Sequence, residues 1–121
     1  MKRIYLAEDS PTQALRVRRI LSSLPDVEVT TFGDGLEAYE GIQQSPPDLL
    51  LMDVIMPTLE GLAVCRLLKF QDSFRHLPIL IFSSITEENI EEVVRSVRAD
   101  AYLRKPFTSE DLVTWVERLL P

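Results

Sequence analysis

The 121-residue sequence has only one cysteine, Cys65, and one histidine, His76. A single cysteine excludes an intramolecular disulfide and a metal site built from cysteines, and it is typical of a reducing compartment. Cys65 falls in a helical apolar pattern with Val64 and Leu68, so we expect a small buried side chain rather than a reactive thiol. His76 stands alone before an apolar run, which predicts a surface loop residue rather than a ligand or phosphodonor.

The sequence also lacks an apolar stretch of membrane-spanning length and a charged-then-apolar segment at its start. We therefore expect no membrane contact and a cytoplasmic location. Basic residues are few, and the net charge of −6 argues against direct nucleic-acid binding. The one basic cluster, Arg16, Arg18 and Arg19, is expected on the solvent side of a helix, with a docking patch for protein or phosphate as the alternative.

The overall composition is that of an ordinary globular protein, with 45% hydrophobic and 26% charged residues. The length favours a single domain over residues 1–121. Five β-like runs alternate with five helix-like stretches, which predicts an α/β fold with a parallel sheet and helices on both faces. The third and fourth of these runs are continuously apolar and should be central strands. The strands are expected at 2–7, 27–32, 48–52, 78–83 and 100–104.

The expected helices begin at recognisable capping residues. Ser10 is a predicted N-cap, with Pro11 at the first helical position and Gln13 as its capping-box partner. The same pattern predicts later helix starts at Asp34 with Glu37, Thr86 with Asn89, and Thr108 with Asp111.

Polar residues gather at the carboxyl ends of the expected strands, which is the ligand-binding edge of a doubly wound sheet. Three carboxylates brought together there would raise one another's proton affinity unless a cation neutralised them, and Mg²⁺ prefers such oxygen ligands. A nearby lysine adds a charge suited to phosphoryl oxygens. The residues at this edge are Glu8 and Asp9, Asp53, Ser83 and Ser84, and Lys105.

Asp53 is the candidate nucleophile of this edge. An aspartate forms an acyl phosphate when a metal and a lysine stabilise the phosphoryl oxygens. Asp53 ends a central strand, and the backbone carbonyl of Ile55 is placed to turn toward the metal before Pro57 closes the loop. Taken alone, Asp53 is equally well read as a loop cap, so the interpretation depends on its companions.

Four motifs together resemble the CheY-like receiver domain of two-component response regulators, and the likeness covers essentially the whole chain. The resemblance implies a three-layer doubly wound flavodoxin-like sandwich of five βα units, with a five-stranded parallel sheet in the order 2-1-3-4-5. The motifs are Glu8-Asp9, Asp53 within MDVIMP, Ser83 after PILIF, and Lys105 within DAYLRKPF.

By this resemblance, Asp53 would accept a phosphoryl group from a phosphohistidine on a sensor histidine kinase or a histidine phosphotransfer protein. Glu8 and Asp9 would hold Mg²⁺ together with Asp53 and the Ile55 carbonyl, with Asp9 the more direct ligand. Lys105 would contact the phosphoryl oxygens. The chain would thus be a phosphoacceptor rather than a turnover enzyme.

The resemblance also implies a switch. Ser83 matches the hydroxyl that moves to bond the phosphoryl group, and Tyr102 matches the aromatic residue that turns inward. The changed surface of the fourth helix, fifth strand and fifth helix would then be read by a downstream protein or a covalently linked output domain, or would form a phosphorylation-dependent homodimer.

Some positions depart from the family pattern. Ser83 stands where threonine is commoner, and Arg98 stands where glycine often precedes the fifth strand. Ile55 and Ile85 occupy the two variable positions that flank the phosphoryl group. Isoleucine shields an acyl phosphate but cannot orient an attacking water, so we expect slow self-dephosphorylation.

Three other functions compete with this interpretation. A haloacid dehalogenase-type phosphatase would need a second aspartate where Ile55 stands, as well as a cap domain. A flavodoxin-like cofactor binder would need a phosphate-cradling loop where the acidic turn at Glu8 and Asp9 lies. A phosphorylation-independent pseudo-receiver, which keeps the fold as an interaction module, stays open as the alternative.

Overall fold

The computed structural model describes residues 1–54, 60–83 and 90–121. These residues form one sheet of five parallel strands in the order β2-β1-β3-β4-β5, which confirms the predicted α/β sandwich and its strand order. The strands are β1 (Lys2–Ala7), β2 (Val27–Phe32), β3 (Leu49–Asp53), β4 (Ile79–Ser83) and β5 (Ala101–Arg104). The helices are α1 (Pro11–Leu21), α2 (Gly35–Gln44), α3 (Gly61–Lys69), α4 (Ile90–Ser96) and α5 (Ser109–Leu119).

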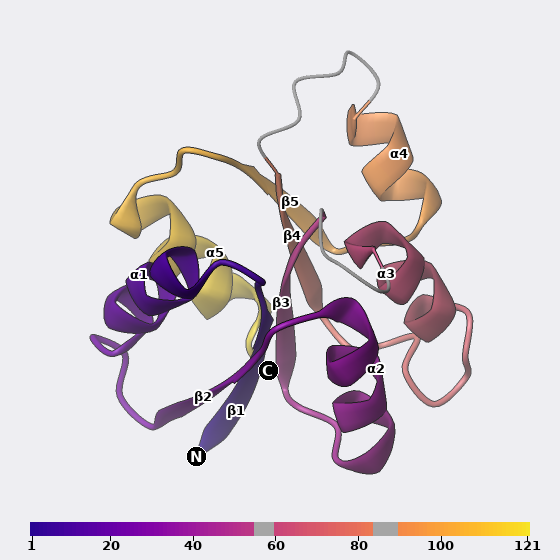
Figure 1. Ribbon diagram of the computed structural model, residues 1–121, viewed down its shortest axis with the longest axis horizontal. Coiled ribbons are helices and arrows are strands. Elements are labelled where there is room, and N and C mark those ends of the chain that lie inside the picture. The colour runs from indigo at the N-terminus through magenta and orange to yellow at the C-terminus, as the bar shows by residue number, and fades with distance from the viewer. Residues whose placement is uncertain (55–59, 84–89) are drawn as a thin grey trace.

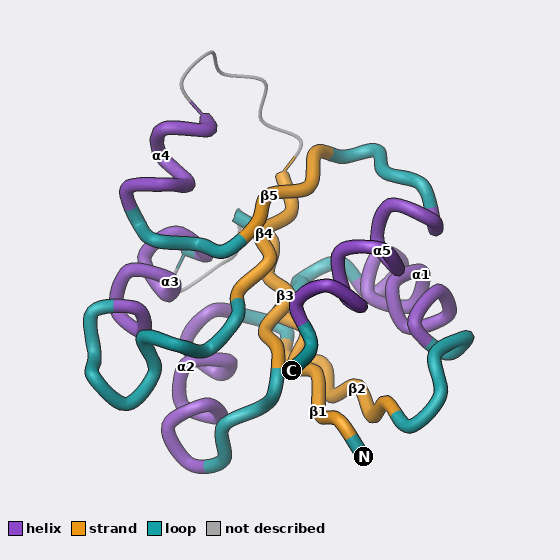
Figure 2. The backbone as a smooth tube through the Cα atoms, turned by 180° about the vertical axis from the view of Figure 1, so that it is seen from behind, coloured by secondary structure: helices purple, strands orange, loops and turns teal. Residues whose placement is uncertain are grey.

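Helices cover both faces of the sheet. α1 and α5 lie on one face, and α2, α3 and α4 lie on the other (Figures 1 and 2). The alternation along β1 divides the core accordingly, because Ile4 and Leu6 pack with the α1 and α5 side chains while Tyr5 and Ala7 pack with those of α2 and α3. Every residue of β3 and β4 is buried, as expected for central strands between two helical layers.

Three strands begin one residue later than predicted. β3, β4 and β5 start at Leu49, Ile79 and Ala101 rather than one residue earlier. Two of the preceding residues are aspartates that bind the backbone of a neighbouring strand through their side chains. Asp48 Oδ2 accepts a hydrogen bond from the Arg3 backbone N–H at 2.8 Å, and Asp100 Oδ2 accepts one from Ile79 at 2.8 Å. The backbone N–H groups of the same two aspartates donate to the Arg3 and Ile79 carbonyls at 2.8 and 3.0 Å, so each aspartate closes the end of its strand with both backbone and side chain.

The helix starts follow the predicted caps wherever the structure describes them. The Ser10 hydroxyl accepts the Gln13 backbone N–H at 3.3 Å, and Pro11 is the first residue of α1. The other two caps are Asp34, which accepts the Glu37 N–H at 2.8 Å, and Thr108, which accepts the Asp111 N–H at 3.0 Å. The predicted start at Thr86 and Asn89 lies outside the described residues.

The turn between α4 and β5 keeps the conformation that glycine favours although it holds an arginine. Arg98 has φ 63°, in the left-handed region. The guanidinium carbon of Arg98 lies 4.3 Å from the centroid of the Phe70 ring. Phe70 is 56% exposed. The cation–π contact to the end of α3 offsets part of the backbone cost at this position.

The predictions for Cys65 and His76 are confirmed. Cys65 is fully buried, its Sγ donates to the Val97 carbonyl at 3.4 Å, and burial raises the pKa of the thiol to about 12. His76 is exposed. Of the helices in the described part of the chain, none combines the length and the apolar character needed to cross a membrane.

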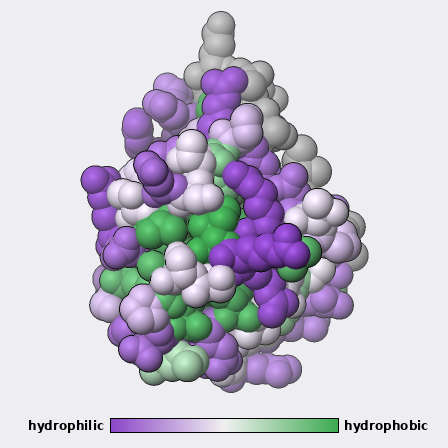
Figure 3. Space-filling view, turned by 90° about the vertical axis from the view of Figure 1, so that its left-hand side faces the viewer, coloured by the Kyte–Doolittle hydropathy of each residue, from purple (hydrophilic) through white to green (hydrophobic). Residues whose placement is uncertain are grey.

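The α1 and α5 face shows where the basic cluster lies. In Figure 3, apolar surface on this face is interrupted by bands of hydrophilic side chains. Arg16, Arg18 and Arg19 are all exposed, which confirms the prediction that they lie on the solvent side of the helix.

A cleft of about 530 Å³ runs between α1 and α5 past Ile20 and Val113. It lies along the flank of the molecule, away from the carboxyl edge of the sheet.

Candidate functional site

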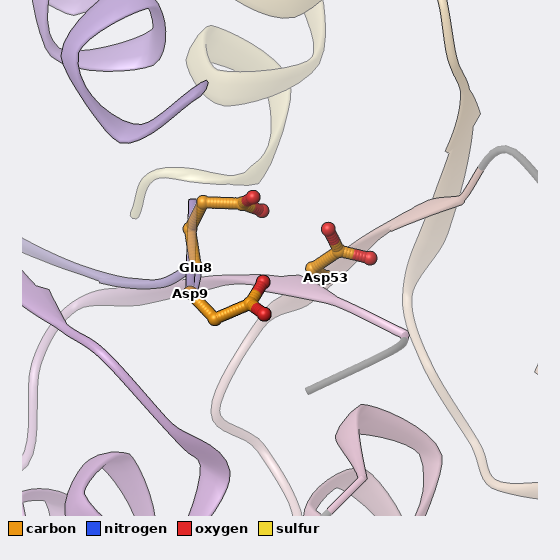
Figure 4. A group of neighbouring side chains, drawn as sticks. All are labelled: Glu8, Asp9 and Asp53. Atoms are coloured by element: carbon orange, nitrogen blue, oxygen red, sulfur yellow. The ribbon is translucent and has the colours of Figure 1, made fainter. Parts of the chain in front are cut away.

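Three carboxylates converge at the carboxyl edge of the sheet, as the sequence predicted. Ala7 of β1 is in register with Met52 of β3, so the residues that follow each of them face one another across the two strands. Each of the three acids offers an oxygen atom that lies within 4.8 Å of those of the other two. Figure 4 shows Glu8 and Asp9, beyond the end of β1, and Asp53, the last residue of β3, with their carboxylates directed toward a common space.

The three acids differ in burial, and burial shifts the pKa of Glu8. Glu8 is 4% exposed and Asp53 is 9% exposed, whereas Asp9 is exposed. The pKa of Glu8 is raised from 4.5 to about 7, mainly by burial and then by the hydrogen bond and the negative charge of Asp53. The Lys105 charge and the Ser10 backbone N–H oppose this shift. Glu8 is therefore the acid that holds a proton when no cation is near.

Lys105 supplies the positive charge of the site. Its Nζ lies 2.6 Å from Asp53 Oδ2 and 3.6 Å from Glu8 Oε2. The backbone places the side chain there, because the Lys105 N–H donates to the Ser83 carbonyl at 2.8 Å, just past the last residue of β5. A protonated lysine has donors but no acceptor, so it pairs with carboxylate or phosphoryl oxygens and leaves the metal ligands to the acids.

The two predicted switch residues lie at different depths. Ser83 is the last residue of β4, is 1% exposed, and joins the site through its carbonyl contact with Lys105. Tyr102 is half-buried in β5, on the side that faces α4, and it borders a cleft of about 290 Å³ with Val94 and Arg95. The remaining predicted site residues, Ile55, Ile85 and Ser84, lie outside the described residues.

Gly61 is a residue of the site that the sequence analysis did not single out for this role. It begins α3, and its N–H donates to the Val54 carbonyl at 2.9 Å. A Cβ atom at this position would lie closer than 3.0 Å to the Asp53 carbonyl oxygen. Only glycine lets the start of α3 approach the Asp53 backbone this closely. The available signal was a glycine at the start of the helix that follows the Asp53 loop.

The donor set fits a hard divalent cation. All three side chains offer carboxylate oxygens, which are the ligands that Mg²⁺ takes in proteins, and Asp9 leaves one side of the cluster open to solvent. Three carboxylates lie beside a single lysine here, and the Asp53 charge adds to burial in raising the pKa of Glu8. The cluster can therefore accept a further positive charge beside the one on the lysine.

Comparisons with known proteins agree with this geometry. The family model of the response regulator receiver domain matches residues 4–117. The chain is 29% identical over 119 residues to the polar-differentiation response regulator DivK of Brucella anthropi, covering 98% of this chain and 96% of that protein. It is 31% identical over 118 residues to the sensor histidine kinase TmoS of Ectopseudomonas mendocina, covering 98% of this chain but 12% of the kinase.

A solved structure shows a similar fold with an ion in place. The receiver domain of a sensor histidine kinase from Pseudomonas aeruginosa, described with a magnesium ion coordinated in its active site cleft, has a TM-score of 0.87 and 28% identity. The match covers 98% of this chain and 96% of that one. The chain is thus similar both to nearly whole regulators and to a small part of longer kinases.

Proposed function

Because this chain belongs to the family of response regulator receiver domains, we propose that residues 1–121 act as a receiver domain whose Asp53 accepts a phosphoryl group. The donor is a phosphohistidine on a sensor histidine kinase or a histidine phosphotransfer protein. One observation carries the proposal: the Asp53 carboxylate ends a central strand with the Lys105 ammonium 2.6 Å away on one side and two further acids on the other. Such an aspartate is positioned and neutralised for phosphoryl transfer.

The transfer itself needs little covalent chemistry from the protein. A carboxylate oxygen of Asp53 forms the new bond to phosphorus while the bond from phosphorus to the imidazole nitrogen breaks. The electron pair of the broken bond stays on that nitrogen, which then takes up a proton. Lys105 stays beside the phosphoryl oxygens and offsets the charge that arrives with them.

Mg²⁺ is the cofactor that we propose for the site. Asp9 and Asp53 would hold it directly, with the Ile55 carbonyl and Glu8 completing the protein's share, because Asp9 is the exposed member of the cluster and Glu8 the buried one. When bound, the ion neutralises the crowded acids and stabilises charge on the phosphoryl oxygens. The ion described in the kinase receiver domain from P. aeruginosa supports this assignment.

The proposed output is a change in the surface formed by α4, β5 and α5. Ser83 would turn its hydroxyl to the phosphoryl group, and Tyr102 would turn inward from its half-buried position beside α4. This local hydrogen bond would shift the equilibrium between two packings of the same structural element. A downstream protein, a covalently linked output domain or a second copy of the chain would read that surface. We expect the exchange to take place in the cytoplasm, with the chain as a stoichiometric acceptor rather than a turnover enzyme.

Magnesium-dependent binding of beryllofluoride, a mimic of the phosphoryl group, tests the proposal. We expect the wild-type chain to bind it and Asp53→Ala to lose binding, while Asp72→Ala, an exposed aspartate after α3, binds as the wild type does. The bound form should also accept no phosphoryl group from a small-molecule donor. A wild-type chain that binds neither beryllofluoride nor phosphoryl groups would instead be the pseudo-receiver.

A further inference from the structure

We propose that Arg16 of α1 is a positioning residue for Lys105, and that it holds the loop between β5 and α5 in the place from which the lysine reaches Asp53. The inference rests on the proposed function of Lys105 as the phosphoryl contact. It concerns a side chain that neither touches the acids nor belongs to the motifs of the sequence.

Arg16 contacts Phe107 in two ways. Its Nη2 donates to the Phe107 carbonyl at 2.6 Å, and the guanidinium carbon lies 4.9 Å from the centroid of the Phe107 ring. A hydrogen bond from a charged donor is stronger than a neutral one, and the guanidinium plane also stacks on an aromatic face. Arg16 is an exposed residue, so these two contacts, rather than burial in the core, fix the position of its guanidinium.

Phe107 connects this contact to the site. Phe107 is 5% exposed. Its ring stacks on the Phe82 ring, with the two ring centroids 5.2 Å apart and an angle of 29° between the ring planes. Phe82 precedes Ser83, whose carbonyl accepts the Lys105 N–H at 2.8 Å. The segment from Lys105 to Phe107 is therefore held by β4 at one end and by α1 at the other.

One side of the segment from Lys105 to Phe107 is open to solvent, so a contact that fixes its backbone matters there. Gln13, Arg16, Lys105 and Pro106 border a cleft of about 340 Å³ that is open to solvent. The Lys105 side chain is 20% exposed, and its 2.6 Å contact with Asp53 depends on where its backbone lies. Because Arg16 borders the cleft on the α1 side, removing its side chain takes away the hydrogen bond from that helix to the backbone carbonyl two residues beyond Lys105.

Arg18 and Arg19 give the contrast on the same helix. Both lie exposed in the last turn of α1, where a positive charge is favourable next to the helix C-terminus. Arg16 lies a turn earlier and reaches 91 residues along the chain to the loop that carries Lys105. The basic cluster thus divides into two charges on the solvent face and one that contacts the site loop.

The test compares Mg²⁺ affinity with beryllofluoride affinity in the full chain, using Arg16→Gln, Arg16→Lys and the control Arg18→Gln. Both ligands are titrated, and circular dichroism checks folding. We expect Arg16→Gln to weaken beryllofluoride binding by about tenfold and to change Mg²⁺ affinity by less than about twofold, because the acids hold the metal and Lys105 holds the phosphoryl mimic. Arg16→Lys should recover part of the loss, since it keeps a donor for the Phe107 carbonyl, and Arg18→Gln should match the wild type.

A double-mutant cycle with Lys105→Ala separates positioning from general destabilisation. If Arg16 acts through Lys105, Arg16→Gln has no further effect on beryllofluoride affinity once the lysine is gone. Additive losses, equal loss of both affinities, or an unchanged beryllofluoride affinity in Arg16→Gln would each overturn the inference while leaving the proposed function standing. A wild-type chain that binds Mg²⁺ but no beryllofluoride would overturn both.

Discussion

The Lys105 ammonium lies 2.6 Å from Asp53 Oδ2 but 3.6 Å from Glu8 Oε2. The lysine thus neutralises Asp53 first, and Glu8 is left with burial and a neighbouring carboxylate. The pKa of Glu8 is raised to about 7 as a result. Burial is the largest cause of this shift, and the Asp53 carboxylate adds to it while the more distant Lys105 charge opposes it.

The first prediction concerns stability and pH. The pKa of Glu8 is about 7 in the folded chain and near its ordinary 4.5 when unfolded, so the folded state holds the proton more tightly. Its stabilising contribution is full below about pH 4.5 and is lost as the pH rises through about 7. Urea unfolding in EDTA should show the wild type losing stability relative to Glu8→Gln across this window. The exposed control Glu28→Gln should stay parallel to the wild type, and a constant gap between wild type and Glu8→Gln would contradict the prediction.

The second prediction concerns metal binding and pH. Mg²⁺ and the proton compete for the acid cluster, so Mg²⁺ affinity should rise with pH by up to about tenfold per unit below pH 7 and then level off. Calorimetric titration at several pH values measures this. Glu8→Gln removes the titrating acid, so its Mg²⁺ affinity should change less over the same range. A wild-type Mg²⁺ affinity that does not change between pH 5 and pH 7 would contradict the prediction.

The third prediction concerns Gly61. Gly61→Ala places a Cβ against the Asp53 carbonyl oxygen, so either α3 or the end of β3 must shift. We expect a loss of about 2 kcal/mol in the free energy of unfolding. Beryllofluoride binding should weaken as well. Gly33→Ala is the matched control, because a Cβ there meets nothing within 4 Å. Equal stability and affinity in the two variants would show that the close approach is relieved at no cost.

The fourth prediction concerns a buried lysine. Lys69 is 4% exposed and pairs with Asp100 Oδ2 at 2.7 Å, and its Nζ also donates to the Leu77 carbonyl at 2.5 Å. Lys69→Met should cost about 3 kcal/mol, because the carboxylate and the carbonyl lose their donor. Arg66→Met, on the exposed side of the same helix, should cost far less. Denaturant unfolding of both variants measures the difference.

The fifth prediction rests on sequence alone. Ile55 and Ile85 flank the phosphoryl group by the family pattern, and neither side chain can orient a water, so the acyl phosphate should decay slowly. The double variant Ile55→Asn, Ile85→Glu should decay faster when both chains are phosphorylated with a small-molecule donor and followed at 25 °C. A wild-type lifetime of seconds, or the same lifetime in both chains, would remove the basis for the prediction.

Much of the fold follows from local patterns in the sequence. The continuous apolar runs predict the two central strands because both faces of β3 and β4 are covered by helices. The cap at Ser10 predicts the start of α1 because its hydroxyl meets a backbone donor only three residues away. The sequence predicts the starts of β3 and β5 one residue early, and in the structure the preceding residues, Asp48 and Asp100, bind the backbone of the neighbouring strand through their carboxylates.

Local patterns are enough to predict which residues meet at the carboxyl edge. The ends of parallel strands share one edge of a sheet, and the chain order puts Glu8, Asp9, Asp53 and Lys105 at those ends. Only the tertiary structure decided how they differ. Burial and the neighbouring Asp53 carboxylate raise the pKa of Glu8 to about 7. The approach of Gly61 to Asp53 and the reach of Arg16 to Phe107 join residues from separate elements, and no local pattern encodes a contact that exists only after those elements pack.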